Sequence, residues 1–192
     1  MATTYQDVLD FWFKELSSKD WFNGPDRVDH AIESRFQETV EAVYSGQHDD
    51  WLQSAQGRLA AILTLDQFPR NLYRRQPRSF SYDDKALKWC LDGIARDEDS
   101  HLEPIQRVFF YLPLEHSEKM ENQDLSLQKY SALVTSVEPD EREQFRVFLN
   151  YAWRHYEIVK RFGRYPHRND VLGRVSTGKE LKFLEQPGSS FL

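Results

Sequence analysis

The chain of 192 residues holds a single cysteine, Cys90. One cysteine excludes an internal disulfide, and it excludes zinc sites or iron–sulfur clusters that need several cysteines from one chain. Only 8 glycines and 8 prolines are present, which is few for an all-β protein rich in turns. No apolar run reaches the roughly 18 residues that a transmembrane helix requires. The N-terminal MATTYQDVLDFWFKEL lacks a basic segment followed by an apolar one, so we expect a cytoplasmic protein.

Basic residues are also fewer than acidic ones, since 25 Lys and Arg stand against 31 Asp and Glu, and the net charge is −6. This acidic background argues against nucleic-acid binding, which normally needs a broad basic face. Basic residues nevertheless concentrate in residues 51–78, with five against one acidic residue, and in 154–174, with six against two. Such segments suit a focused site for a small anion. Pairing of the same arginines with the acidic segments is the alternative interpretation.

Apolar residues recur every three or four positions along almost the whole chain, which is the spacing of amphipathic helices. No stretch alternates convincingly with a period of two. The pattern predicts an all-α protein with one domain over residues 1–192, built as an array of about eight helices in antiparallel pairs. Pro25 is expected in the first turn of one helix. Pro113 is expected to kink or split a helix that runs from Leu102 to about Met120.

Motifs for common cofactors are absent. There is no glycine-rich phosphate loop, no HExxH and no GxSxG nucleophile elbow. The Glu-x-x-His spacing of di-iron bundles occurs once, from Glu98 to His101, within a charged connection. Cys90 shares an apolar stripe with Leu87 and Leu91, which is typical of a buried inert thiol. We therefore expect no metal site and no cofactor.

Three polar blocks interrupt the apolar pattern, and the first is LTLDQFPRNLYRR at residues 63–75. Asp66, Gln67, Arg70 and Asn71 follow an apolar run, so their backbone is expected to lie against the core. They are candidate ligand-binding residues. The alternative is local structure, with Asp66 paired to Arg70 and Asn71 capping a helix, because buried polar groups at helix junctions are usually satisfied nearby.

The second block is FFYLPLEHSEKMENQ at residues 109–123. A histidine near a carboxylate is typical of an acid/base pair, since the histidine charge changes near neutral pH. His116 and Glu118 are therefore catalytic candidates. If one helix continued through both residues, His116 and Gln123 would share a face at spacing i, i+7. The alternative is a core histidine hydrogen-bonded to a neighbour.

The third block is GRYPHRNDVLGR at residues 163–174. Arginine offers a planar fork for carboxylate or phosphate, which makes Arg164, Arg168 and Arg174 candidate anion ligands. His167 is a further acid/base candidate. The alternative is that these arginines tie helix ends to nearby carboxylates.

The residues around these arginines predict local turns. Asn169 is typical of a turn, and Gly173 can supply a positive φ. Downstream, Thr177 followed by Glu180 at the third position predicts a capping box at the start of a short terminal helix.

The segments DQFPRNLYR, LPLEHSE with a following Gln123, and GRYPHRNDVLGRVSTGKELKFL resemble the signature blocks of a bacterial family known as domain of unknown function 924. The FWF at residues 11–13 and Trp21-Phe22 match as well, so the resemblance spans essentially the whole chain. It implies an all-α fold akin to tetratricopeptide-repeat arrays. It implies no established reaction or ligand, so it marks motif positions and no catalytic residues.

These observations leave three functions open. In the first, the blocks converge on a pocket for an anionic small molecule, with His116, Glu118 and His167 as catalytic candidates; this is the preferred hypothesis, because concave sites with a few convergent polar groups are the usual ligand sites. In the second, helix pairs form a groove for a peptide or protein partner. In the third, the blocks are purely structural. The candidate ligand-binding residues are Asp66, Gln67, Arg70, Asn71, Gln123, Arg164, Arg168, Asn169 and Arg174.

Overall fold

A computed structural model describes residues 3–22 and 26–190. These residues are mostly helical and none of them forms a β-strand, which confirms the all-α prediction. None of the helices described is long and apolar enough to cross a membrane. The chain divides into two compact units. The first comprises the residues up to Arg74 together with Arg78–Pro113, and the second comprises Arg75–Pro77 and the residues from Leu114 onward.

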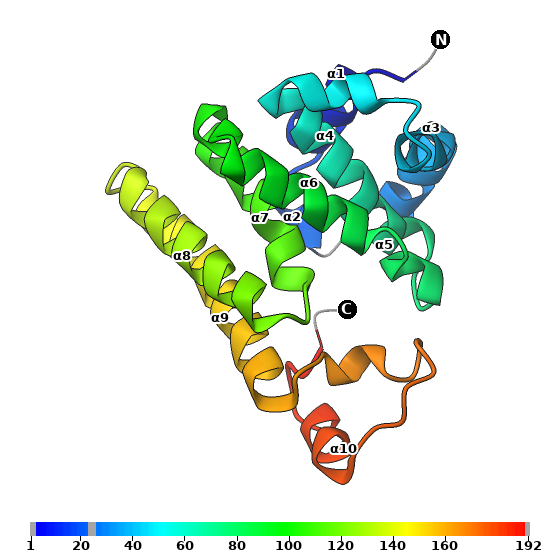
Figure 1. Ribbon diagram of the computed structural model, residues 1–192, viewed down its shortest axis with the longest axis vertical. Coiled ribbons are helices and arrows are strands. Elements are labelled where there is room, and N and C mark those ends of the chain that lie inside the picture. The colour runs from blue at the N-terminus through cyan, green and yellow to red at the C-terminus, as the bar shows by residue number, and fades with distance from the viewer. Residues whose placement is uncertain (1–2, 23–25, 191–192) are drawn as a thin grey trace. The chain divides into compact units, whose positions relative to one another are not determined.

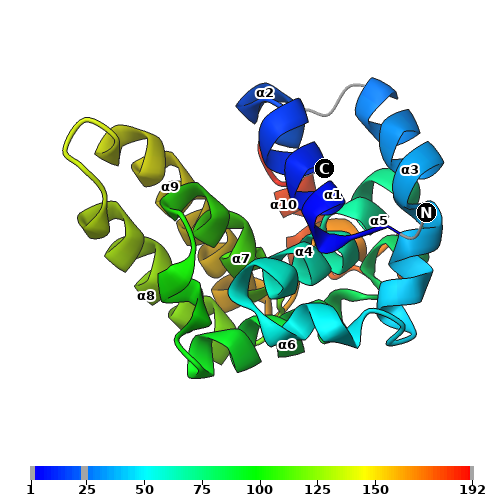
Figure 2. The same cartoon turned by 90° about the horizontal axis from the view of Figure 1, so that it is seen from above.

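The first unit is built around helix α4, in which every residue from Gly57 to Asp66 is buried. Figure 2 shows α4 among the other helices of this unit. Helices α1, α3 and α6 pack against it. A helix that is apolar on all sides is typical of a core helix enclosed by its neighbours. The elements that begin in this unit are α1 (Tyr5–Asp10), the π-helical η1 (Phe11–Glu15), α2 (Ser18–Phe22), α3 (Asp26–Tyr44), the 3-10 helix η2 (Asp49–Gln53), α4 (Ala55–Asp66), α5 (Phe68–Leu72), α6 (Asp83–Ala95), the 3-10 helix η4 (Glu98–His101) and α7 (Pro104–His116).

Aromatic side chains fill the centre of the first unit. The ring centroids of Phe11 and Phe36 lie 5.1 Å apart, and Phe68 lies 5.1 Å from Phe36. Trp12 lies 5.9 Å from Phe68 in a tilted arrangement. Such pairs contribute about 0.5–1.5 kcal/mol each beyond the burial of their area. The aromatic residues near the N-terminus therefore serve the core of this unit.

The second unit is a helical hairpin followed by a long loop and a short helix (Figure 1). Its first two helices, α8 (Met120–Ser136) and α9 (Arg142–Phe162), run antiparallel because only residues 137–141 connect them. The loop contains the 3-10 helix η5 (Pro166–Arg168) and leads to α10 (Gly178–Leu184). A further 3-10 helix, η3 (Pro77–Phe80), begins in the short segment assigned to this unit.

One predicted helix boundary differs from the structure, and a second prediction falls outside the described residues. The helix that was expected to run to about Met120 ends at His116, and it continues through Pro113 without being split there. The prediction for Pro25 lies outside the described residues. The single-domain organisation and the tetratricopeptide-repeat-like arrangement stay predictions.

Candidate functional site

The loop of residues 163–177 is positioned by its glycines and by local hydrogen bonds. Gly163 ends α9 with a φ of 69° and donates to the carbonyl oxygen of Val159 at 2.7 Å. Only glycine adopts this left-handed conformation without steric cost. Gly173 has a φ of 66°, as predicted, and the next N–H, of Arg174, donates to the carbonyl oxygen of Asn169 at 2.7 Å. These hydrogen bonds fix the backbone of the loop and thereby the positions from which its side chains extend.

Tyr165 lies at the centre of the polar contacts of the second unit and is fully buried. Its backbone N–H donates to Glu118 Oε1 at 2.8 Å, and its carbonyl oxygen accepts from Arg174 Nη2 at 3.0 Å. Its hydroxyl group donates to the carbonyl oxygen of Glu115 and accepts from Gln123 Nε2 at 2.9 Å. Burial raises the pKa of the Tyr165 hydroxyl, so this group stays protonated and keeps its role as a donor.

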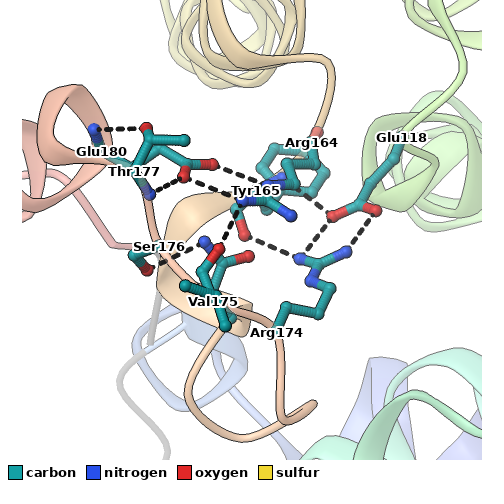
Figure 3. A network of polar contacts seen from close by, with 9 residues as sticks. Glu118, Arg164, Tyr165, Arg174, Val175, Ser176, Thr177 and Glu180 are labelled. Carbon is teal, nitrogen blue, oxygen red and sulfur yellow. Dashed lines mark hydrogen bonds and ion pairs between the residues drawn. The ribbon is translucent and has the colours of Figure 1, made fainter.

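Arg174 and Glu118 form a two-pronged ion pair within the second unit (Figure 3). Arg174 Nη1 donates to Glu118 Oε2 at 2.7 Å, and Nη2 donates to Oε1 at 3.0 Å. Burial alone would raise the pKa of Glu118, but the hydrogen bonds from Arg174 and from the Tyr165 N–H outweigh it and hold the pKa below its usual value. Glu118 is therefore an ionised acceptor that ties the loop to the segment after α7.

Arg164 forms the second ion pair of the loop, with Glu180 of α10 (Figure 3). Arg164 Nε donates to Glu180 Oε1 at 2.7 Å and Nη2 donates to Oε2 at 2.9 Å. The Thr177 N–H donates to Glu180 Oε2, and the Glu180 N–H donates to the Thr177 hydroxyl oxygen, so the predicted capping box is confirmed. The hydrogen bonds from Arg164, followed by those from Thr177, hold the pKa of Glu180 far below its usual range against the opposing effect of burial.

We expect the Glu180→Gln variant to be less stable than the wild-type protein by about 2 kcal/mol, because it leaves the Arg164 guanidinium without its charged partner and weakens a cap. Urea unfolding at pH 7 measures the change. The matched control is Glu185→Gln, since Glu185 is exposed just after the same helix. A loss for Glu180→Gln no larger than that of the control would contradict a stabilising role for this pair.

Side chains of α8 and of the loop donate hydrogen bonds to carbonyl oxygens at the C-terminal end of α7. Gln123 Nε2 lies within hydrogen-bond distance of two of them, those of Leu114 and Glu115, at 3.3 and 2.9 Å, and of the carbonyl oxygen of Ser117, just after the helix, at 2.6 Å. Arg168 Nη1 donates to the carbonyl oxygen of His116 at 3.0 Å. The last carbonyls of a helix lack partners within the helix, so these side chains give α7 a stable end at His116.

The predicted relation between His116 and Gln123 was wrong in its form. The two residues do not share one helix face, because α7 ends at His116 and α8 begins at Met120. Gln123 instead reaches back across the turn between the helices to the carbonyl oxygens of Glu115 and Ser117, the residues on either side of His116. This placement follows from hydrogen bonding between segments, which helical periodicity does not encode.

His167 lies beside Tyr165 and close to other positive groups. Its ring centroid is 5.5 Å from that of Tyr165, and the Arg168 guanidinium lies over the Tyr165 ring at 4.5 Å. Burial, together with the charge of Arg168 and the nearby His155, lowers the pKa of His167 to about 3. The imidazole is therefore neutral near pH 7.

The sequence did not single out a buried pair formed by Glu115 and His155. His155 Nδ1 lies 3.1 Å from Glu115 Oε2 and 2.9 Å from the carbonyl oxygen of Tyr151. Both neighbours are acceptors, so Nδ1 carries the proton. The His155 ring also contacts His116, with centroids 6.1 Å apart. The sequence signal that could have indicated a buried His155 is its position on the apolar stripe of α9, three residues after Ala152.

A partly open hollow of about 440 Å³ borders the loop. Of the predicted site residues in this unit, His167 and Arg174 line it, whereas His116 and Glu118 are not among its lining residues. The lining residues are Pro166, His167, Asp170, Arg174, Ser176, Leu181, Leu184, Ser189 and Ser190. The hollow is the place where the third block meets α10 and the C-terminal segment.

Comparison with known proteins assigns the chain to a family. Residues 8–188 match the model of a family described as "Bacterial protein of unknown function (DUF924)". The chain belongs to this family. A solved structure of a protein of unknown function from Agrobacterium tumefaciens, ATU0120, is 34% identical and superposes with a TM-score of 0.84. The match covers 94% of this chain and 96% of that chain. No curated protein matches the chain.

The first of the three polar blocks belongs to the first unit, where contacts within that unit engage its side chains. Arg70 donates to both carboxylate oxygens of Asp83 at 3.0 Å and lies 3.6 Å from Asp66 Oδ1. Gln67 Nε2 donates to Asp66 Oδ2 at 2.5 Å. The Asn71 side chain donates to Asp29 at 2.7 Å. These contacts support local structure as one role of the first block.

The second and third blocks meet within the second unit, through Glu118, Gln123, Tyr165 and Arg174. Asn169 is buried, and its Nδ2 donates to Ser176 Oγ at 3.0 Å. Among the described residues, no group of three or more His, Cys, Asp or Glu is placed to hold a metal ion.

Proposed function

We propose that the second unit binds a small molecule carrying an anionic group in the hollow beside residues 163–177. The observation that supports this most is the lining itself, in which an arginine, a histidine and several hydroxyl groups border an open space together with apolar side chains. Its volume of about 440 Å³ lies within the range of roughly 300–1,000 Å³ that is typical of ligand sites.

Arg174 is the residue of the loop that is best suited to contact the anion. A guanidinium has five N–H donors, and the contacts described for Arg174 engage three of them, with Glu118 and the Tyr165 carbonyl oxygen. Of the two remaining donors, Nε–H is buried, which leaves the second hydrogen of Nη1 as the donor for a ligand in the hollow. The pair with Glu118 fixes the guanidinium in place, so little ordering is left to be done when a ligand binds.

The other two arginines of the loop support its structure. Arg164 is paired with Glu180 and also donates to the carbonyl oxygen of Val175 at 2.9 Å. Arg168 is buried, donates to the end of α7 and lies over Tyr165. These contacts favour the structural interpretation for Arg164 and Arg168 and leave the ligand contact to Arg174.

The protonation states favour binding over proton transfer. An effective general base has a pKa near the working pH, and His167, with a pKa lowered to about 3, is a weak one. Glu118, held ionised by Arg174, is a poor general acid near neutral pH. We therefore propose hydrogen bonding as the contribution of His167, and we propose no reaction for His116 and Glu118.

We expect a thermal-shift screen of small carboxylates and phosphates to raise the melting temperature for at least one ligand. Arg174→Lys removes the planar guanidinium group and is expected to abolish the shift in melting temperature. Ser176→Ala leaves the Arg174–Glu118 ion pair in place and is expected to reduce the shift. Arg146→Lys is the matched control, because Arg146 is exposed on α9 and pairs only locally, with Glu143. The proposal fails if no compound stabilises the protein, or if the shift persists unchanged in both hollow variants.

A second candidate function is docking of a protein or peptide on α9. Val147, Tyr151 and Trp153 are large apolar residues on this helix that are exposed to solvent. Val147 and Tyr151, four residues apart, share one helix face. Exposed aromatic residues are enriched where proteins bind partners, which is the observation that favours this candidate.

A further inference from the structure

The hollow of the second unit contains one acidic and one basic side chain. Asp170 and Arg174 both line it. Among the contacts of the described residues, no ion pair joins the two. Arg174 is paired with Glu118 but keeps N–H capacity beyond that pair, and Asp170 has no ion pair among the contacts of the described residues. A ligand that carries both an anionic and a cationic group would therefore find a partner for each in the lining. We propose that the hollow takes a zwitterion, namely a free α-amino acid with an apolar side chain; this rests on the proposed function and names its ligand class.

The carboxylate end of the amino acid is assigned to Arg174 and Ser176. Asn169 is 1% exposed, and its Nδ2 donates to Ser176 Oγ at 3.0 Å. The Ser176 oxygen therefore already accepts a hydrogen bond, and its hydroxyl hydrogen is directed elsewhere. In the hollow, this hydroxyl group acts as a donor beside the Arg174 guanidinium. A donor and a cation together match a carboxylate.

The ammonium end is assigned to Asp170 and Ser189. Ser189 Oγ donates to the carbonyl oxygen of Leu184 at 3.1 Å, so its single hydrogen is engaged and its oxygen can only accept from a ligand. Ser189 is buried, which holds this orientation. Asp170 is exposed and contributes a carboxylate. Of the three serines in the lining, Ser176 and Ser189 thus have opposite hydrogen-bonding roles, as the two ends of an amino acid require.

Besides the polar His167 and Ser190, the remaining lining of the hollow is apolar. Pro166, Leu181 and Leu184 line it, and Leu181 is 53% exposed although it is a large apolar residue. An aliphatic side chain on the ligand would cover this surface and gain from its burial. The ligand is therefore expected to resemble leucine more than glycine or glutamate.

The charge pattern also argues against a phosphate as the natural ligand. A phosphate monoester carries close to two negative charges near pH 7. In the hollow it would meet one arginine, already paired with Glu118, and the negative charge of Asp170. An amino acid places only one negative charge beside Arg174, and its ammonium group is attracted by Asp170.

The test is isothermal titration of the full chain with leucine, 4-methylpentanoate, 3-methylbutylamine and inorganic phosphate. 4-Methylpentanoate lacks the ammonium group of leucine and 3-methylbutylamine lacks the carboxylate. We expect leucine to bind about tenfold or more tightly than either, the discrimination that one charge-assisted hydrogen bond gives. Asp170→Asn is expected to bring the affinity for leucine down to that for 4-methylpentanoate, and Ser176→Ala to weaken both.

The matched control is Glu185→Gln, which removes an exposed carboxylate near the end of α10 that does not line the hollow. It should leave all affinities unchanged. Equal binding of leucine and 4-methylpentanoate, unaltered by Asp170→Asn, overturns the zwitterion while the proposed anion site stands. Binding of phosphate alone likewise overturns the zwitterion and leaves the anion site standing. Absence of binding by every compound overturns the zwitterion, and the anion site is then decided by the thermal-shift screen.

Discussion

Replacing Tyr165 with alanine is expected to lower the free energy of unfolding by about 4 kcal/mol, in the range measured for the loss of large buried aromatic side chains. Tyr165 is fully buried and its ring contacts His155 at 5.6 Å and His167 at 5.5 Å. Its hydroxyl group satisfies the carbonyl oxygen of Glu115 at the end of α7. The substitution leaves a cavity and removes the hydrogen bonds of the hydroxyl group with the Glu115 carbonyl oxygen and with Gln123, and these costs add.

Urea unfolding of the Tyr165→Ala and Tyr165→Phe variants separates the two contributions. Tyr165→Phe keeps the ring and removes only the hydroxyl group, so we expect a loss of about 1–2 kcal/mol. Tyr151→Ala serves as the control because Tyr151 is a tyrosine of α9 that is 42% exposed. If Tyr165→Ala cost no more than Tyr151→Ala, Tyr165 would not be the residue that holds the polar contacts of this unit together.

Acidification is expected to destabilise the protein through His167. The pKa of His167 is lowered to about 3 in the folded state, against about 6.5 in an unfolded chain. Between these values the unfolded chain binds a proton that the folded protein does not, so stability falls as the pH falls. The slope for one such group is about half of 1.4 kcal/mol per pH unit at pH 6.5 and approaches the full value at lower pH, which gives about 1.5–2 kcal/mol between pH 6.5 and pH 5.

Comparison of the wild-type protein with His167→Gln isolates this contribution. Urea unfolding at pH 6.5, 5.75 and 5 should show a smaller loss for the variant, by about 1.5–2 kcal/mol over the interval. Glu118 and Glu180 have lowered pKa values, so their contributions to stability are present above about pH 4.5 and are lost only at lower pH. Parallel stability profiles for the two proteins would show that His167 is protonated in the folded state as readily as in the unfolded chain.

Features with a local cause could be predicted well from the sequence. The capping box of Thr177 and Glu180 depends on four consecutive residues, and the structure contains both of its hydrogen bonds. The positive φ of Gly173 likewise reflects a single residue in a turn. The all-α architecture follows from helical periodicity, which each segment carries by itself. Local chemistry was sufficient in these cases because the interacting groups are adjacent in the chain.

Features that depend on distant segments were missed or left open. The end of α7 at His116 depends on Gln123 and Arg168, which donate to its last carbonyl oxygens from α8 and the loop. The buried contact of Glu115 with His155 joins residues 40 positions apart in the sequence. A histidine on an apolar stripe does not reveal which carboxylate it meets. Such partners are chosen by packing, and packing has no signature in the spacing of one segment.

The sequence by itself determined that this protein is helical, that its polar residues gather in three blocks, and that the last block ends in a capped helix. It also offered two roles for the arginines of residues 163–174, anion binding or structural pairing. The tertiary structure decided between these roles. Arg164 pairs with Glu180 and Arg174 pairs with Glu118, and Arg174 in addition lines a hollow. The physical reason is that the charge of an arginine is fixed by its chemistry, whereas its partner depends on which carboxylate the fold brings within reach.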